Sequence, residues 1–388
     1  MKIDKRVAPI IFPFILVMLC DLFNILLPSF FKYTDEVIVI LAFIMWIMRV
    51  INKRNNNGMF IYILVLFLLG IAGNIIYIIN DNYKNVVIDC FSFFKPMILL
   101  LYILSVKEKY HWDKINYLLV KISKNIIIIL AAGAIVSMFK AGIMQDIEGN
   151  FSFFTEYCGT IGFWCITFLA ILYENMNNKF LIYYFLTVFI ILRTGSGLAL
   201  LSAVIMFAMY LFIGKKKKFK WYYIFILVPI ALYVSRDEIS NYLLNQNAPR
   251  ALLIRYSFIT ANKYFPFGSG FGTFGSRVAA EDYSQLYKLF GFNRIWGLSE
   301  GYHPYLLDNY YPQIIGQTGY LGCIAFVMLI ISILKKIVLM TLNSWKKYGA
   351  LYLIACWLIA GLGFNNTGSW GTITMGLVPV IAFSNSRK

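Results

Sequence analysis

Charged side chains are scarce in this sequence of 388 residues, in which Asp, Glu, Lys and Arg make up 14% and hydrophobic residues 60%. A soluble domain carries about a quarter charged residues, and the mean hydropathy of +0.71 is correspondingly high. The shortage argues against a soluble protein. It is explained if most of the chain lies in lipid, where each ionisable group costs several kcal/mol. We therefore expect an all-α polytopic membrane protein.

Histidine is nearly absent, with two in the chain, and the six cysteines contain no CxxC pair. A zinc-binding histidine cluster outside the membrane is therefore excluded. The cysteines all fall in apolar stretches and are typical of reduced packing residues. We expect no cofactor and no metal, although a divalent ion held by carboxylates near Asp308 stays open. The first apolar run lacks a small-residue cleavage site, so we expect it to be retained as a span.

Long apolar runs recur along the whole chain. A membrane-spanning helix needs about 20 apolar residues, and the runs predict about twelve spans. The expected ranges are 8–30, 36–51, 59–79, 86–105, 117–139, 157–173, 179–193, 197–213, 220–235, 312–334, 349–364 and 369–384. They divide the chain into an N-terminal transmembrane bundle (1–235), one large extracytoplasmic loop (236–311) and the last three helices (312–388).

The charge that is present is mostly basic, with 35 Lys and Arg against 18 Asp and Glu. If the N-terminus is cytoplasmic, the cytoplasmic segments hold 23 of these 35 basic residues and four of the 18 acidic ones, leaving 12 and 14 elsewhere. This asymmetry follows the positive-inside rule. We therefore expect a multi-pass protein of the cell membrane with both termini in the cytoplasm. The run Lys215–Lys218 is then a topological anchor, and nucleic acid is not an expected partner.

The loop over residues 236–311 is far longer than a connection needs. Its Gly-, Tyr-, Phe- and Arg-rich composition predicts a segment folded against the membrane surface. Within it, Gly270-x-Gly272-x-x-Gly275 matches the dinucleotide fingerprint in form. No strand–helix–strand unit surrounds these glycines, and the loop faces away from the nucleotide pool. A bend packed under aromatic rings is the better interpretation.

Basic side chains outside the cytoplasm are candidates for binding an anion. An arginine at a membrane boundary needs a compensating anion, and a guanidinium binds phosphate or diphosphate bidentately. Arg193 lies between two apolar runs, and Lys95 lies deep in a span. Asp89, six positions before Lys95, is poorly spaced to pair with it and could merely be solvated. The large loop adds Arg250, Arg255, Lys263, Arg277 and Arg294. Ordinary snorkelling or salt-bridged side chains are the alternative for all of these cations.

A polar cluster, GYHPYLLDNYY, closes the loop at residues 301–311. His303 and Asp308 are candidates for a general base, and Asn309 and Tyr310 are candidates for contacts to substrate. Two alternatives stay open. Asp308 and Asn309 both favour N-cap positions, and tyrosines at a membrane boundary often form an interfacial belt.

With these residues in view, the chain resembles the O-antigen and capsular polysaccharide polymerases of the Wzy type and, more distantly, the O-antigen ligases. The architecture is similar along the whole chain. Three stretches look like family motifs in the family's order: LRTGSGLALL (192–201), RYSFITANKYFPFGSGFGTF (255–274) and DNYYPQIIGQTGYLG (308–322).

The sequence departs from the family pattern at two positions. Gly197 stands where the family commonly has arginine, and Arg193 would share its face if the stretch is helical. Asp308 stands where ligases commonly have histidine, which favours a polymerase over a ligase.

The resemblance implies polymerisation of lipid-linked oligosaccharide repeat units into O-antigen or capsular polysaccharide. The donor would be a glycan on undecaprenyl diphosphate, with Asp308 or His303 as base and Arg255 with Arg193 near the departing diphosphate. The activated leaving group makes a cofactor unnecessary. Expected partners are the lipid bilayer, the undecaprenyl-diphosphate-linked oligosaccharide, and the chain-length regulator and flippase of the same pathway. A lipid-linked oligosaccharide flippase is the alternative from another class. Such transporters usually show related halves, and no internal repeat is visible here.

Overall fold

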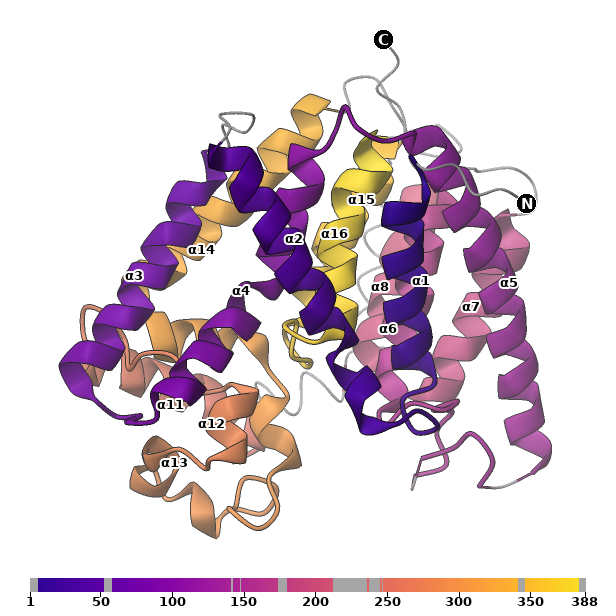
Figure 1. The fold of residues 1–388 in the computed structure, drawn as a ribbon. Coiled ribbons are helices and arrows are strands. Elements are labelled where there is room, and N and C mark those ends of the chain that lie inside the picture. Colours follow the sequence, from indigo (N-terminus) through magenta and orange to yellow (C-terminus); the bar gives the residue numbers. More distant parts are fainter. Residues whose placement is uncertain are drawn as a thin grey trace.

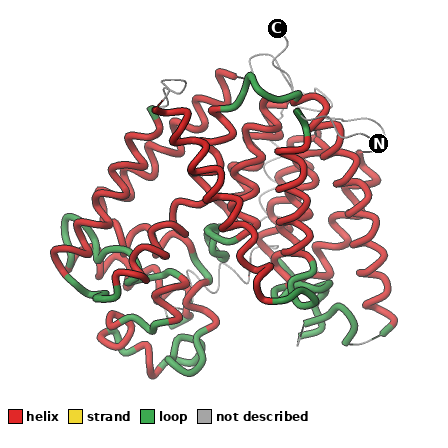
Figure 2. The backbone as a smooth tube through the Cα atoms, in the orientation of Figure 1, coloured by secondary structure: helices red, strands yellow, loops and turns green. Residues whose placement is uncertain are grey.

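The computed structural model describes residues 6–51, 58–140, 142–146, 148–173, 180–211, 236, 245, 247–340 and 346–383. Within these ranges the regular elements are helices and no strand occurs (Figure 2). The expected all-α class is therefore confirmed. The predicted ninth span, 220–235, and the basic run Lys215–Lys218 lie outside the described residues.

Apolar helices make up most of the described chain. In chain order they are α1 (Ala8–Leu22), α2 (Thr34–Ile51), α3 (Met59–Tyr77), α4 (Tyr83–Ser105), α5 (Trp112–Phe139), α6 (Cys158–Tyr173), α7 (Phe180–Thr194), α8 (Gly197–Met209), α14 (Tyr310–Met340), α15 (Lys346–Ala360) and α16 (Ser369–Phe383). Among them, α3, α4, α5 and α14 are each long and apolar enough to cross a membrane. Many large apolar side chains on α2 and α3 are exposed, as expected of surfaces that face lipid.

Most predicted spans match a helix to within a few residues, and α14 begins at Tyr310, two residues before the expected boundary. The first span is the main exception. It was expected to continue to residue 30, but α1 ends at Leu22. The following apolar residues turn toward the 142–157 segment, where the Ile25 N–H donates to the Phe154 carbonyl at 3.1 Å. A short 3₁₀ helix, η1 (Ser29–Tyr33), then leads into α2.

From α1 to α8, and again from α14 to α16, successive apolar helices alternate in direction, so the molecule has two distinct ends (Figure 1). At one end the start of α1 meets the α4–α5 connection, where the His111 N–H donates to the Arg6 carbonyl at 3.4 Å. The end of α16 joins them, with the Trp112 and Phe383 rings 4.9 Å apart. We call this end the terminal face. The opposite end carries α11–α13 (Figure 1).

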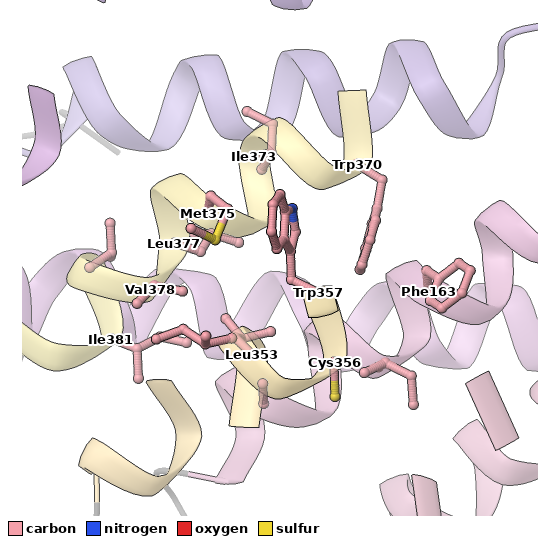
Figure 3. Packing of buried hydrophobic residues seen from close by; sticks show 14 of the residues in the cluster. Phe163, Leu353, Cys356, Trp357, Trp370, Ile373, Met375, Leu377, Val378 and Ile381 are labelled. Carbon is pink, nitrogen blue, oxygen red and sulfur yellow. The ribbon is translucent and has the colours of Figure 1, made fainter. Parts of the chain in front are cut away.

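The core between α6, α15 and α16 is built around two tryptophans, Trp357 and Trp370 (Figure 3). Trp370 stacks near Phe163 with ring centroids 4.8 Å apart, and its indole N–H donates to Thr167 Oγ1 at 2.9 Å. The Trp357 indole N–H donates to the Gly371 carbonyl at 3.1 Å. A buried indole N–H needs such a partner. The bond from Trp357 to the Gly371 carbonyl joins α15 to α16 across the 361–368 connection.

The described part of the large loop is a folded unit, which we call the cap (residues 247–308). It contains α11 (Pro249–Lys263), α12 (Arg277–Glu281), α13 (Gln285–Leu289), η4 (Phe292–Arg294) and η5 (Pro304–Leu307). Its own hydrophobic cluster includes fully buried Leu253, Phe274, Tyr287, Phe292 and Leu306. The cap face of the molecule is the end that carries this unit.

A glycine-rich loop, residues 267–276, anchors the cap between α3, α4 and α14. Asn74 accepts from the Phe271 N–H at 2.8 Å and donates to its carbonyl at 2.9 Å. The backbone N–H groups of Ser269 and Gly270 donate to the carbonyls of Gly316 and Gln317 in α14. These amides are therefore engaged within the protein, and Phe271 and Phe274 are fully buried. The sequence interpretation of a packed bend, and not a phosphate cradle, is confirmed.

Asp89 completes this anchor, and the alternative that it is merely solvated does not hold. Its side chain is buried in α4, and Oδ2 accepts from the Gly272 N–H at 2.6 Å and from Gln317 Nε2 at 2.8 Å. Burial forces a carboxylate to find donors. The sequence offered no sign of these donors, because they lie 183 and 228 positions away along the chain.

Candidate functional site

A cavity of about 950 Å³ lies on the cap face, between the cap and helices α1, α2, α4, α6 and α8. Its wall is rich in ionisable side chains. The carboxylates are Asp21, Asp35, Glu36, Asp89, Asp146, Glu148, Glu156, Glu281 and Asp308, and the cations are Lys32, Lys95, Arg250 and Arg277, with His303 beside them. A chain with only 18 acidic residues thus places nine of them around one space. The cavity is therefore the leading candidate site.

Lys95 forms the deepest ion pair of the wall. Its ammonium is 2.7 Å from Asp35 Oδ2 and 2.9 Å from Glu36 Oε1, and the Lys95 and Asp35 side chains are 5% and 2% exposed. Lys95, a candidate for binding an anion, does line the cavity, and its partners are Asp35 and Glu36 and not the poorly spaced Asp89. The burial of Lys95 and Asp35 is sustained here by their mutual pairing and by the partly exposed Glu36, as lipid-embedded charges require.

The remaining cations of the wall are also paired. Arg250 Nε lies 3.3 Å from Asp308 Oδ2, which ties α11 to the end of the cap. Arg277 Nε lies 2.7 Å from Glu281 Oε1 one helical turn later, and this hydrogen bond raises the pKa of the Arg277 guanidinium. Lys32 pairs with Glu156 across the cavity mouth. Among the residues that the structure describes, each lysine and arginine on the wall has a carboxylate partner that also lines it.

The 301–311 cluster divides between the cavity and the core. His303 and Asp308 both line the cavity, and His303 Nδ1 is 3.1 Å from the Glu300 carbonyl oxygen. Asn309 is fully buried, and its Oδ1 accepts from the Tyr311 N–H at 3.2 Å, which is the N-cap bond of α14. Of the two residues proposed as caps, Asn309 therefore takes that role, and Asp308 faces Arg250.

Tyr310 does not line the cavity, and neither does Asn309, so the structure does not bring these two candidates for substrate contact to it. Tyr310 is 1% exposed and packs against Trp357, with ring centroids 5.4 Å apart. The cause is the start of α14, which turns both side chains into the protein as soon as the helix begins.

The Thr194–Gly197 turn lines the cavity, but Arg193 does not. The stretch is not one helix. Gly195 has φ +67°, a left-handed conformation that glycine adopts without strain, and Ser196 accepts from the Ala199 N–H to begin α8. Arg193 therefore belongs to the end of α7 and cannot replace an arginine at position 197 by sharing its face. Its Nε atom is buried and has no hydrogen-bond partner within the described ranges.

Three cations predicted to bind substrate lie on the outside of the cap. Arg255, Lys263 and Arg294 are exposed and do not line the cavity. In α11 the buried side consists of Leu252, Leu253, Ser257, Thr260 and Ala261, so Arg255 is on the opposite side. Lys263 lies over the Tyr264 ring at 5.3 Å. Sequence reasoning thus selected the correct loop, but it did not separate the inner from the outer face.

Several wall residues were missed. No role was assigned to Asp35 and Glu36, because the lysine that they pair with lies 60 and 59 positions further along the chain. Asp21 was not selected either, and it accepts from Trp164 Nε1 at 2.6 Å. Asp146 and Glu148 come from the short acidic loop before α6, which nothing in the local sequence connects to the cavity.

Comparison with known proteins gives no relative for this chain, because no family model matches it and no curated protein matches it. The polymerase resemblance therefore depends on the architecture and on the three short stretches. In the structure those stretches meet near the cavity. The first supplies the Thr194–Gly197 turn, the second supplies the glycine-rich loop beneath the cap, and the third begins with Asp308 on the wall.

Proposed function

We propose that this protein joins lipid-linked oligosaccharide repeat units into a polysaccharide, of the O-antigen or capsular kind, at the outer face of the cytoplasmic membrane. The proposal includes about twelve spans, both termini in the cytoplasm and the cap outside. The positive-inside charge distribution supports this orientation, because the terminal face carries Lys107, Lys109 and Lys114 in the α4–α5 region.

The observation that carries the proposal is the polar cavity under the cap, with His303 and Asp308 on its wall. A space of about 950 Å³ at one end of a membrane bundle suits a ligand that is part sugar and part lipid. The wall combines carboxylates, an imidazole and paired cations. These are the groups that a glycosyl transfer from a diphosphate needs.

In the proposed reaction, the acceptor hydroxyl loses its proton to Asp308 or His303. Its oxygen forms a bond to the anomeric carbon of the donor, and the bond from that carbon to the diphosphate oxygen breaks. The lipid diphosphate leaves with the electron pair. A diphosphate that enters the cavity competes with Asp308 for Arg250 and with Glu281 for Arg277. Binding would thereby draw Arg250 away from the Asp308 carboxylate, the proposed base. These two arginines replace Arg255 and Arg193 in the proposal.

The decisive experiment uses purified protein in liposomes with defined undecaprenyl-diphosphate-linked repeat units. A polymerase yields a ladder of longer lipid-linked glycans. The runner-up, a flippase, moves the units across the bilayer without lengthening them, and a ligase transfers glycan only when a second acceptor is supplied. The cap favours a transferase over a flippase, because moving a glycan requires no folded unit at the membrane surface. The bilayer and the pathway's chain-length regulator and flippase remain the proposed partners.

A further inference from the structure

A second, apolar groove of about 440 Å³ lies on the membrane side of the cavity. Helices α1, α2, α4 and α16 form its wall, with Lys109 and Tyr110 at its far end on the terminal face. Its lining between the helices is almost wholly hydrocarbon, including Phe14, Leu41, Met45 and Leu377. In Figure 1, α2 leans away from α1 toward the terminal face, and the groove lies along these two helices.

The groove and the cavity meet end to end on all four helices. On α1, Val17 lines the cavity and Phe14 lines the groove, and the same change occurs from Glu36 to Ile38 on α2. On α4, Lys95 lines the cavity and Leu99 lines the groove. On α16, Ser369 lines the cavity and Ile373 lines the groove. Each step is at most four residues, which is about 6 Å along a helix or slightly more than one turn. The two spaces therefore adjoin along four helices, with a charged wall on one side of the boundary and an apolar wall on the other.

We propose that the groove holds the hydrocarbon chain of the lipid-linked donor, while its diphosphate and sugars occupy the cavity. This inference rests on the proposed function. A chain whose headgroup lies in the cavity must leave it toward the membrane, and the groove begins where the charged wall ends. Lipid tails are as apolar as leucine, so burial alone gives little affinity inside a bilayer. The groove would instead orient the donor by packing against its chain.

The test maps where the chain lies. The wild-type protein is irradiated with undecaprenyl diphosphate that carries a diazirine on its lipid chain, and the labelled peptides are identified by mass spectrometry. Label on α2 around Leu41 and Met45 is expected. A parallel sample receives phosphatidylglycerol with a diazirine on one acyl chain. Label on other helices, or equal labelling of the groove by the phospholipid, would overturn the assignment to the carrier.

Two variants narrow the groove without touching the cavity. Leu41→Trp and Met45→Trp replace partly exposed groove residues, and Leu64→Trp on α3 is the matched control, because Leu64 is similarly exposed and lines neither space. The groove variants should lose carrier labelling about tenfold at normal abundance and thermal stability, while the control should not. If both groove variants keep full labelling, the inference is wrong.

The two proposals fail separately. Wild-type protein that is labelled in the groove but never lengthens glycans would reject the polymerase and keep a carrier-lipid site. Protein that polymerises but is labelled outside the groove would reject only the proposal that the groove holds the hydrocarbon chain.

Discussion

Two neighbouring residues at the end of the cap, Asp308 and Asn309, have different partners and can be tested separately. Asp308→Asn should abolish polymer while leaving abundance and thermal stability near normal. The carboxylate lines the cavity and pairs with Arg250, whereas the helix cap belongs to Asn309. Glycan ladders on gels and a melting curve in detergent give the two readouts.

The control for that experiment is Asn309, the N-cap residue of α14. Asn309→Asp keeps an N-cap acceptor, whereas Asn309→Ala should cost about 1 kcal/mol of stability. If Asp308→Asn polymerises normally, His303→Gln becomes the informative variant, because His303 is the other candidate base on the wall. Normal polymer from both single variants would remove the chemistry from this cluster.

A pair of arginines in α11 tests which face of the cap binds substrate. Arg250→Gln should sharply reduce polymer, since Arg250 lines the cavity and pairs with Asp308. Arg255→Gln should leave polymer yield within about twofold of wild type, because a surface substitution away from a site changes energies by about 0.5 kcal/mol. Polymer assays at matched expression compare the two. The reverse order of effects would restore the arginine selected from the sequence motif.

At the scale of elements, the glycine-rich loop and α14 meet too closely for side chains. Gly319 interrupts α14 with φ 65°, and an added Cβ would lie 2.9 Å from the Gly268 nitrogen and 3.0 Å from the Pro266 carbonyl oxygen. Gly319→Ala should therefore lower stability by about 1–3 kcal/mol. Thermal unfolding in detergent measures this change.

Gly58→Ala is the comparison for that variant. Gly58 has ordinary helical angles and no atom within 4 Å of an added Cβ. If both alanine variants melt at the same temperature, the close approach at Gly319 does not determine stability.

How far the sequence predicted these elements depends on the range of the interactions involved. Apolar runs and their lengths were enough for the helices and most of their ends. They failed at Leu22, where the chain leaves the helix to contact the distant 142–157 segment. They did predict the break between α7 and α8, which contains the left-handed residue Gly195. The site was predicted in part, because Lys95, Arg250, Arg277, His303 and Asp308 do line one cavity. The partner of Lys95 lies 60 positions away, and helical spacing carries no information at that range.

At the scale of the whole molecule, the proposed orientation is open to direct labelling. Glu108→Cys lies on the terminal face and Asn293→Cys on the cap, and both positions are exposed. In intact cells a membrane-impermeant maleimide should modify only Asn293→Cys, because the positive-inside rule puts the terminal face in the cytoplasm. The parent chain, whose described cysteines are buried or partly buried, sets the background. Modification of both positions, or of Glu108→Cys alone, would contradict the orientation.

The anchoring of the glycine-rich loop also determines when the chain can finish folding during synthesis. Ser269 and Gly270 are synthesised before Gly316 and Gln317, whose carbonyls accept their N–H groups. Ser269 and Gly316 are 47 positions apart. At about 5–20 residues per second, the ribosome needs a few seconds to synthesise that stretch. Until then the loop has its partners on α3 and α4 but lacks those on α14. A chain that stalls before Gly316 would expose these amides at the cap face, where a quality-control protease could distinguish it from a completed protein.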